Sequence, residues 1–231
     1  SHRELIRKSR DENLAFNVAI VGYTNAGKST LLNKLTDANI LAEDKLFATL
    51  DPTTRKLKLG SGQEILVTDT VGFIRKLPHH LIEAFKSTLE EAKYANLLVH
   101  MVDASNEEAS SQMLVVYDTL RSLDVVDKDI ITVFNKTDLI KEGEELPRDF
   151  HADKILKMSA KTGDGIEDLK KTIENILQNQ RVYLEHIFSY KDAGKIALIR
   201  KFGEIKSEEY TDDGILIKAY IPAEIFGKVM G

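Results

Sequence analysis

An eight-residue stretch near the N-terminus has the residue types and spacing of a phosphate-binding loop. Gly22, Gly27, Lys28 and Ser29 fit the pattern GxxxxGK[ST]. In such a loop, backbone N–H groups surround phosphate oxygens, the lysine reaches the β- and γ-phosphates, and the serine hydroxyl binds Mg²⁺. A β-branched run ends at Gly22 and helical character returns after Gly27, which is the strand, loop and helix order that the motif needs. The residues expected around the phosphates are Gly22, Tyr23, Thr24, Asn25, Ala26, Gly27, Lys28, Ser29 and Thr30.

A second polar segment, Asp69-Thr70-Val71-Gly72, directly follows the apolar run 65–68. Open α/β sheets bind their ligands at the C-terminal ends of their strands. We therefore expect Asp69 to hold Mg²⁺ and the backbone N–H of Gly72 to approach the γ-phosphate. Seen alone, this segment is equally compatible with a structural turn.

A third segment, Asn135-Lys136-Thr137-Asp138, follows the apolar run 130–134 and predicts which base is bound. Guanine presents N1–H and N2–H₂ as adjacent donors that Asp138 can accept together, whereas adenine has an acceptor at N1 and no N2 amine. ATP would leave the carboxylate unpaired, and sites of this kind discriminate strongly. Asn135 and Lys136 are expected to line the base and brace the phosphate loop. Further base contacts are expected from Ser159, Ala160 and Lys161 after the next apolar run. The predicted ligands are therefore GTP and GDP.

Composition describes a folded protein and excludes several kinds of chemistry. The 231 residues are 42% hydrophobic and 30% charged, with 4 Pro and 13 Gly, which is typical of a globular chain. The absence of Cys excludes disulfides and thiolate sites. A net charge of −5 argues against coating of nucleic acid by bulk attraction. The charged N-terminus and the lack of an apolar run near ~18 residues predict a cytoplasmic protein with no membrane span.

The elements that must position these segments alternate along the chain. Apolar runs at 17–21, 65–68, 97–102, 130–134 and 155–158 leave room for helices between most of them. This order predicts an α/β domain with a mostly parallel six-stranded sheet and helices on both faces. The run 57–59 before Gly60 and Gly62 predicts a hairpin that adds an antiparallel edge strand. Helical apolar spacing is seen at Met113, Val116 and Leu120, and again at Ile166, Leu169, Ile173 and Leu177.

The chain is expected to contain three parts. Residues 1–14 are read as a linker remnant or tag, 15–179 as a GTPase domain, and 180–231 as a small α+β domain. In the last part we predict strands at 182–188, 205–210 and 215–221, a helix at 193–202, and a final helix opened by Pro222. The Asp213-Gly214 pair predicts a hairpin between the last two strands.

Four longer segments resemble the HflX family of ribosome-associated GTPases, within the Ras-like, translation-factor-related GTPases. They are GYTNAGKST at 22–30, LFATLDPTTR at 46–55, DTVGFIRKLPHHL at 69–81 and FKSTLEE at 85–91. The resemblance implies a GTPase that binds the large ribosomal subunit, is stimulated by it, and acts in ribosome splitting or rescue under stress. We also expect contact with rRNA, no role on DNA and a monomeric chain. The family carries an N-terminal domain and a helical linker ahead of the GTPase domain, and residues 3–12 are expected to be the tail of that linker.

Mg²⁺ also needs a threonine hydroxyl from the first switch segment. The resemblance favours Thr49, within Phe47-Ala48-Thr49-Leu50-Asp51, and a Ras-like pattern makes Thr53 the alternative. The expected metal ligands are Ser29, Thr49 and Asp69. The expected catalytic residues are Lys28, Thr49 and Gly72.

Phe73 stands where Ras-type enzymes place the glutamine that orients the attacking water. A phenyl ring cannot hydrogen-bond to water, so intrinsic hydrolysis is expected to be slow. K⁺ held by Asn25, or a partner such as the ribosome, could supply the missing positioning. The alternative function is a nucleotide-gated RNA-binding or ribosome-assembly module in which hydrolysis serves only as a reset.

Overall fold

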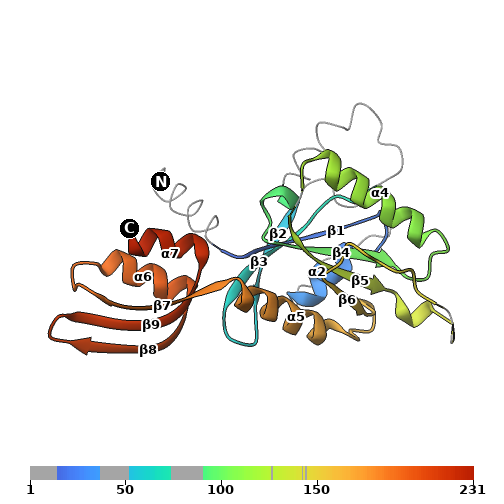
Figure 1. Cartoon of the computed structure of the whole chain (residues 1–231). Helices are drawn as coiled ribbons and strands as arrows, with labels where there is room; N and C mark the ends of the chain where they lie inside the picture. The colour runs from blue at the N-terminus through green and yellow to red at the C-terminus, as the bar shows by residue number, and fades with distance from the viewer. Residues whose placement is uncertain (1–14, 37–51, 74–90, 126, 142, 144) are drawn as a thin grey trace. The chain divides into compact units, whose positions relative to one another are not determined.

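The computed structural model describes residues 15–36, 52–73, 91–125, 127–141, 143 and 145–231 (Figure 1). The chain divides into two compact units. One unit contains Phe16–Leu57 and Ile65–Lys170, and the other contains Lys58–Glu64 and Lys171–Gly231. The boundary expected at residue 180 from the sequence stays a prediction.

The first unit is built on a six-stranded sheet with the order β2-β3-β1-β4-β5-β6. The strands are β1 (Asn17–Gly22), β2 (Thr53–Lys58), β3 (Glu64–Asp69), β4 (Leu97–Asp103), β5 (Asp129–Asn135) and β6 (Lys154–Lys157). β1 pairs in parallel with β3 and β4, and β5 pairs in parallel with β4 and β6. The C-terminal ends of these five strands therefore lie along one edge of the sheet. The predicted mostly parallel α/β sheet is confirmed.

Burial explains which strands were easy to predict. β1 and β4 are buried along almost their whole length because parallel central strands are covered on both faces. The edge strands β2 and β6 are mostly exposed. β2 begins at Thr53, four residues before the run expected at 57–59, because its first residues are polar and give no apolar signal. β6 ends at Lys157, one residue before the expected Met158.

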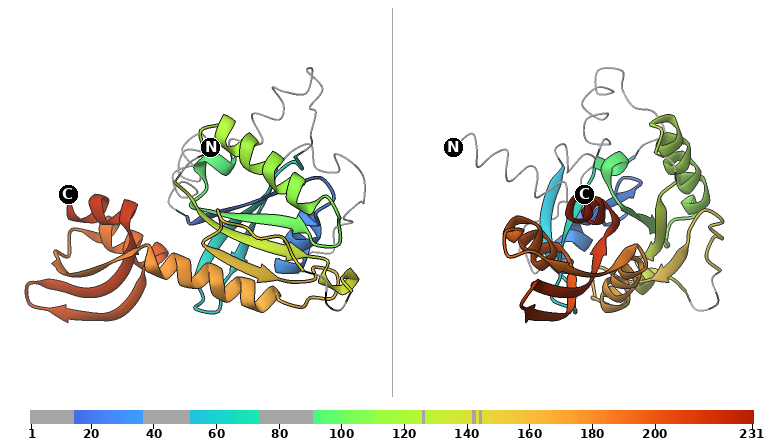
Figure 2. Two further views of the ribbon diagram at one scale, coloured as in Figure 1. Left: turned by 45° about the vertical axis from the view of Figure 1, so that its right-hand side comes forward. Right: turned by 60° about the vertical axis from the view of Figure 1, so that its left-hand side comes forward.

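Helices cover both faces of this sheet. α4 (Ala109–Ser122) packs on one face and α2 (Lys28–Leu35) on the other (Figures 1 and 2). Met113, Val116 and Leu120 of α4 are buried, as their helical spacing predicts. A short 3₁₀ helix, η2 (Thr137–Leu139), follows β5, and α5 (Ile166–Asn179) follows β6.

A cluster of polar side chains is buried beneath α4. The Asp149 carboxylate accepts hydrogen bonds of 2.6 Å from the hydroxyls of Tyr117 and Thr132. His100 of β4 places Nδ1 3.2 Å from the Tyr117 hydroxyl oxygen. Burial lowers the pKa of His100 to about 4, against the attraction of Asp149. The His100 imidazole is therefore neutral at physiological pH.

The second unit contains a three-stranded antiparallel sheet in the order β7-β9-β8. Its elements are β7 (Arg181–Phe188), α6 (Ala193–Phe202), β8 (Glu204–Thr211), β9 (Gly214–Pro222) and α7 (Ala223–Met230). These agree with the predicted elements to within one residue at each end. β8 and β9 meet at Thr211 and Gly214, which is the hairpin that the Asp213-Gly214 pair predicts.

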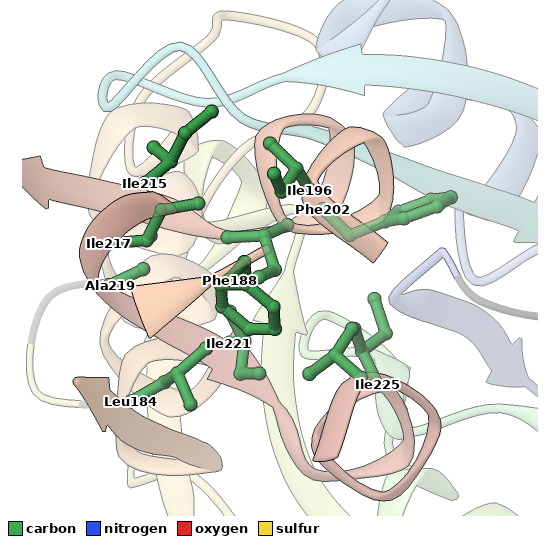
Figure 3. Packing of buried hydrophobic residues seen from close by; sticks show 11 residues of the cluster. Leu184, Phe188, Ile196, Phe202, Ile215, Ile217, Ala219, Ile221 and Ile225 are labelled. Atoms are coloured by element: carbon green, nitrogen blue, oxygen red, sulfur yellow. The ribbon is translucent and has the colours of Figure 1, made fainter. Parts of the chain in front are cut away.

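The core of this second sheet lies between its inner face and the helices α6 and α7. Figure 3 labels nine side chains of this core cluster: Leu184, Phe188, Ile196, Phe202, Ile215, Ile217, Ala219, Ile221 and Ile225. The alternate residues of β9 from Ile215 to Ile221 all face this core, which is the period-two pattern of a sheet with one covered face.

Candidate functional site

The phosphate loop joins β1 to α2. Gly22 is the last residue of β1, and Gly27 is the N-cap of α2 with φ 96°. A Cβ on Gly27 would lie 2.3 Å from Nδ2 of Asn135, so both the positive φ and the close approach require glycine here. Lys28 is the first residue of α2, and its Nζ donates to the carbonyl oxygen of Tyr23 at 3.1 Å. The lysine is thus held over its own loop.

Lys28 is almost fully buried, which changes its acid–base behaviour. Burial lowers the pKa of Lys28 to about 8, and the attraction of Asp69 opposes that shift only in part. An ammonium group is poorly solvated at such a place and favours the approach of an anion. The geometry and the electrostatics are those of a receptor for phosphate.

Asp69 is the last residue of β3 and lies beside the phosphate loop. The hydroxyl of Ser29 donates to Oδ2 of Asp69 at 2.5 Å. A hydroxyl and a carboxylate in contact are hard oxygen ligands, the type that Mg²⁺ binds. Among the described residues no group of three or more His, Cys, Asp or Glu could hold a metal by itself. A cation here would therefore need ligands from a bound nucleotide as well.

The segment after Asp69 pairs with the start of the phosphate loop. Phe73 donates its N–H to the carbonyl of Gly22 at 3.0 Å, and Thr24 donates its N–H to the carbonyl of Phe73 at 2.9 Å. Gly72 lies so close that an added Cβ would be 3.0 Å from Nζ of Lys28. The Phe73 side chain is only 2% exposed and packs in a core cluster with Val21 and Leu98. The ring is therefore directed into the core.

Asn135 connects the phosphate loop to the proposed base-binding segments. It is the last residue of β5 and is 2% exposed. Its Nδ2 donates to the carbonyl of Ala26 at 2.8 Å, and its Oδ1 accepts from the N–H of Ala160 at 2.9 Å. Three segments that are far apart in the sequence thus meet at one side chain.

Asp138 and Ser159 form the other half of the proposed base site. The hydroxyl of Ser159 donates to Oδ1 of Asp138 at 2.6 Å. The Asp138 residue is exposed, whereas Ser159 and Ala160 are buried and Lys161 is exposed. The buried Ser159 hydroxyl therefore orients the carboxylate of the exposed Asp138.

The structure brings together most of the residues that the sequence proposed. Gly22–Thr30, Asp69–Gly72, Asn135–Asp138 and Ser159–Lys161 all follow or lie at the C-terminal ends of parallel strands. Phe47, Ala48, Thr49, Leu50 and Asp51 lie outside the described residues. Thr53, the alternative to Thr49, is the exposed first residue of β2.

Sequence reasoning missed Asp103, which is the last residue of β4. Its Oδ2 accepts a 2.7 Å hydrogen bond from Nζ of Lys136. The signal was available, because a carboxylate that directly follows an apolar run was the observation that led to Asp69.

Comparison with known proteins gives the family. A family profile described as "50S ribosome-binding GTPase" matches residues 17–136. A GTPase HflX from Lacrimispora saccharolytica is 63% identical over 228 residues, which are 99% of this chain and 54% of that protein. A GTPase HflX from Caldanaerobacter subterraneus subsp. tengcongensis is 46% identical over 97% of this chain and 51% of that protein. The chain spans about half the length of these relatives.

Solved structures show the same fold. A GTP-binding protein from Sulfolobus solfataricus, crystallised in complex with GDP, is 27% identical with a TM-score of 0.56. That match covers 76% of this chain and 55% of the other. A point variant of Era from Aquifex aeolicus, bound to GDP·AlF4⁻, is 28% identical with a TM-score of 0.57 over 70% of this chain and 56% of the other. The resemblance to HflX is confirmed by the relatives, and the chain belongs to the family of 50S ribosome-binding GTPases.

Proposed function

We propose that this chain binds GTP and GDP and hydrolyses GTP to GDP and phosphate. The observation that carries the proposal is the Asn135 side chain, which ties the phosphate loop at Ala26 to the base segment at Ala160. A nucleotide has phosphates and a base at a fixed distance from each other, so a phosphate-binding loop and a base-binding loop joined by one side chain suit a nucleotide.

Guanine is the base that fits the polar groups. Asp138, supported by Ser159, presents a carboxylate that can accept two adjacent donors. Ala160, whose N–H already donates to Asn135, and Lys161 lie on the same loop and would border the base. ATP would bring an acceptor to the carboxylate, so we expect GTP to bind at least about 10⁴-fold more tightly than ATP.

Hydrolysis would depend on positioning and on charge. Lys28 and the backbone of Gly72 would face the γ-phosphate, because Gly72 lies against the lysine ammonium. Ser29 and Asp69, with Thr49, would hold Mg²⁺, which neutralises phosphate charge when it is bound. We keep Lys28, Thr49 and Gly72 as the proposed catalytic residues.

The intrinsic rate should be low. The buried Phe73 ring cannot orient water, so another group has to do so. Asn25 is exposed in the phosphate loop with φ 61°, and we retain it as the proposed site of K⁺. The buried Phe73 ring also favours a second candidate function, because slow hydrolysis suits a switch more than a fast enzyme. This candidate is a nucleotide-gated RNA-binding or ribosome-assembly module that uses hydrolysis only as a reset.

The proposed partner is the large ribosomal subunit, with rRNA contact and a role in ribosome splitting or rescue. The ribosome assignment rests on the family match, which is described as "50S ribosome-binding GTPase", and the role in splitting or rescue rests on the likeness to HflX GTPases. No helix in the described part of the chain is long and apolar enough to cross a membrane. We further propose a monomeric, cytoplasmic protein with a GTPase domain at 15–179 and a small domain at 180–231.

The test measures nucleotide binding and turnover on the same preparation. Affinities for GTP, GDP and ATP are compared for the wild type, for Lys28→Ala, and for Lys34→Ala as an exposed lysine on the same helix. We expect Lys28→Ala to abolish binding and Lys34→Ala to behave like the wild type. Similar affinity for GTP and ATP would contradict the base assignment.

Turnover is then measured with and without large subunits, in K⁺ and in Na⁺. Stimulation by subunits or by K⁺ supports the two proposed substitutes for the missing glutamine, and equal rates in all four conditions would remove both. Sedimentation with large subunits in a nonhydrolysable GTP analogue and in GDP separates the two candidate functions. If hydrolysis serves only as a reset, a variant that binds GTP but does not hydrolyse it should stay bound to large subunits. Complete dissociation of that variant from the subunits would contradict the reset role.

A further inference from the structure

We propose that Asp103 is a positioning residue for the guanine base and acts through Lys136. The inference rests on the proposed nucleotide site and adds a residue outside its four segments. Asp103 lies at the end of β4, and Lys136 directly follows β5. The observation behind the proposal is the 2.7 Å hydrogen bond from Nζ of Lys136 to Oδ2 of Asp103.

The two strands bring these residues together by register. β4 and β5 are parallel, and Asp103 lies opposite Asn135 at the last paired position. The N–H of Ala104 then donates to the carbonyl of Asn135 at 2.9 Å, which extends the pairing by one step. Lys136 leaves the strand with φ 65°, a left-handed conformation. The base segment therefore begins at a backbone position that β4 holds in place.

The carboxylate of Asp103 is itself fixed. Its Oδ1 accepts from the N–H of Ser105 at 3.1 Å and from the Ser105 hydroxyl at 2.7 Å. Its Oδ2 accepts from Lys136. Because each oxygen has its own partner, the carboxylate is held in one orientation and can in turn hold the ammonium.

Burial distinguishes this ion pair from an ordinary surface pair. The side chains of Lys136 and Asp103 are 26% and 13% exposed, with N and O 2.7 Å apart. In Arg121 and Asp118, on the outside of α4, the corresponding values are 70% and 74% at 3.7 Å. Exposed pairs contribute little, whereas a partly buried hydrogen-bonded pair can fix a side chain.

Because Asp103 fixes the ammonium group of Lys136, the aliphatic part of the Lys136 side chain is restricted to a narrow range of conformations. The four methylene groups of lysine form an apolar surface that can lie against a purine ring, with the charge kept at the far end. This contact would not distinguish exocyclic groups, because it meets the face of the ring. Base identity would be read by Asp138, and Asp103 would set how firmly any purine is held.

The experiment measures GDP and IDP dissociation constants and GDP release rates for the wild type, Asp103→Asn, Lys136→Met and the double variant. IDP lacks the N2 amine, so the ratio of the two constants reports on Asp138. We expect Asp103→Asn to weaken GDP and IDP by the same factor, about five- to tenfold, mainly through faster release. We expect no further loss when it is added to Lys136→Met, because the two residues act as one unit. Asp118→Asn is the matched control and should change nothing.

Three results would overturn the proposal. They are an unchanged GDP affinity in Asp103→Asn, an equal further loss in the Lys136→Met background, and a changed ratio of GDP to IDP, which would indicate general loosening of the strand ends. If Asp103→Asn does not fold, Ser105→Ala tests the same arrangement by removing one bond to Oδ1, and we expect about two- to threefold weaker GDP binding that disappears in the Lys136→Met background. A wild-type chain that binds no GDP would instead refute the proposed function.

Discussion

The side-chain amide of Asn135 donates to the backbone carbonyl of Ala26 across 109 residues of sequence, at 2.8 Å. The same amide group accepts from the N–H of Ala160. One buried side chain thus sets the spacing between the loop proposed for phosphates and the loop proposed for the base.

Asn135→Ala should weaken both nucleotide binding and the fold. The change leaves the Ala26 carbonyl and the Ala160 N–H without their partner in a buried place, which costs about 2–4 kcal/mol in the free energy of unfolding. We expect GDP affinity to fall at least about tenfold. Urea unfolding and GDP titration measure the two effects. Asn179→Ala, at an exposed position of α5, is the control, and equal behaviour of the two variants would contradict the bridging role.

Gly72→Ala should impair GTP hydrolysis. The new Cβ would lie 2.8 Å from Cα of Thr24 and 3.0 Å from Nζ of Lys28, so either the phosphate loop or the lysine has to move. A displacement on this scale beside the γ-phosphate should reduce turnover by about 10²-fold. Gly194→Ala, whose Cβ meets nothing within 4 Å, is the control. Single-turnover hydrolysis measures the effect, and a rate within twofold of the wild type would show that the loop has room for a methyl group.

The binding of GDP should be coupled to the uptake of a proton by Lys28, and the uptake per bound GDP should increase as the pH rises above 7. Burial lowers the pKa of Lys28 to about 8, and bound phosphates favour its charged form. The neutral fraction of free Lys28 grows from about 0.1 at pH 7 to about 0.8 at pH 8.5, so proton uptake should grow in the same way. Calorimetry in two buffers with different ionisation enthalpies measures it. Lys28→Arg, which stays charged, should show a smaller uptake at pH 8.5, and the same uptake in both proteins would assign the proton to another group.

The buried cluster beneath α4 should make stability fall in mild acid. The pKa of His100 is about 4 in the fold and about 6.5 in an unfolded chain, so the unfolded chain binds a proton first as the pH falls. The contribution of His100 to the free energy of unfolding is fully present above about pH 6.5. It decreases toward pH 4, by up to about 3 kcal/mol. Burial raises the pKa of Asp149, but hydrogen bonds from Thr132, Tyr117 and the His151 N–H outweigh it and hold that pKa below its usual value. The contribution of Asp149 is therefore lost only at lower pH.

His100→Gln tests this assignment because it cannot titrate. Urea midpoints at pH 7, 5.5 and 4.5, followed by circular dichroism, should fall less steeply for His100→Gln than for the wild type. His186→Gln, at an exposed position of β7, is the control and should keep the wild-type slope. Parallel slopes in all three proteins would show that other groups cause the acid sensitivity.

Local pattern was enough to determine the order of the elements and the fold class. Runs of β-branched residues, helical apolar spacing and turn residues act over a few positions, so 193–202 could be identified as a helix and 213–214 as a hairpin turn from the sequence alone. The polar edge strand β2 was the exception, because a strand with little buried surface carries little apolar signal.

Only the tertiary structure decided which polar side chains meet. Register between β4 and β5 places Asp103 beside Lys136, and burial turns the Phe73 ring into the core. Asp103 and Lys136 are distant in the chain, and so are Phe73 and its core neighbours Val21 and Leu98. The sequence near each of these residues does not indicate which residue it will contact. Spacing along the chain predicts chemistry within a motif, whereas distances and burial between motifs arise when the sheet forms and brings the strand ends to one edge.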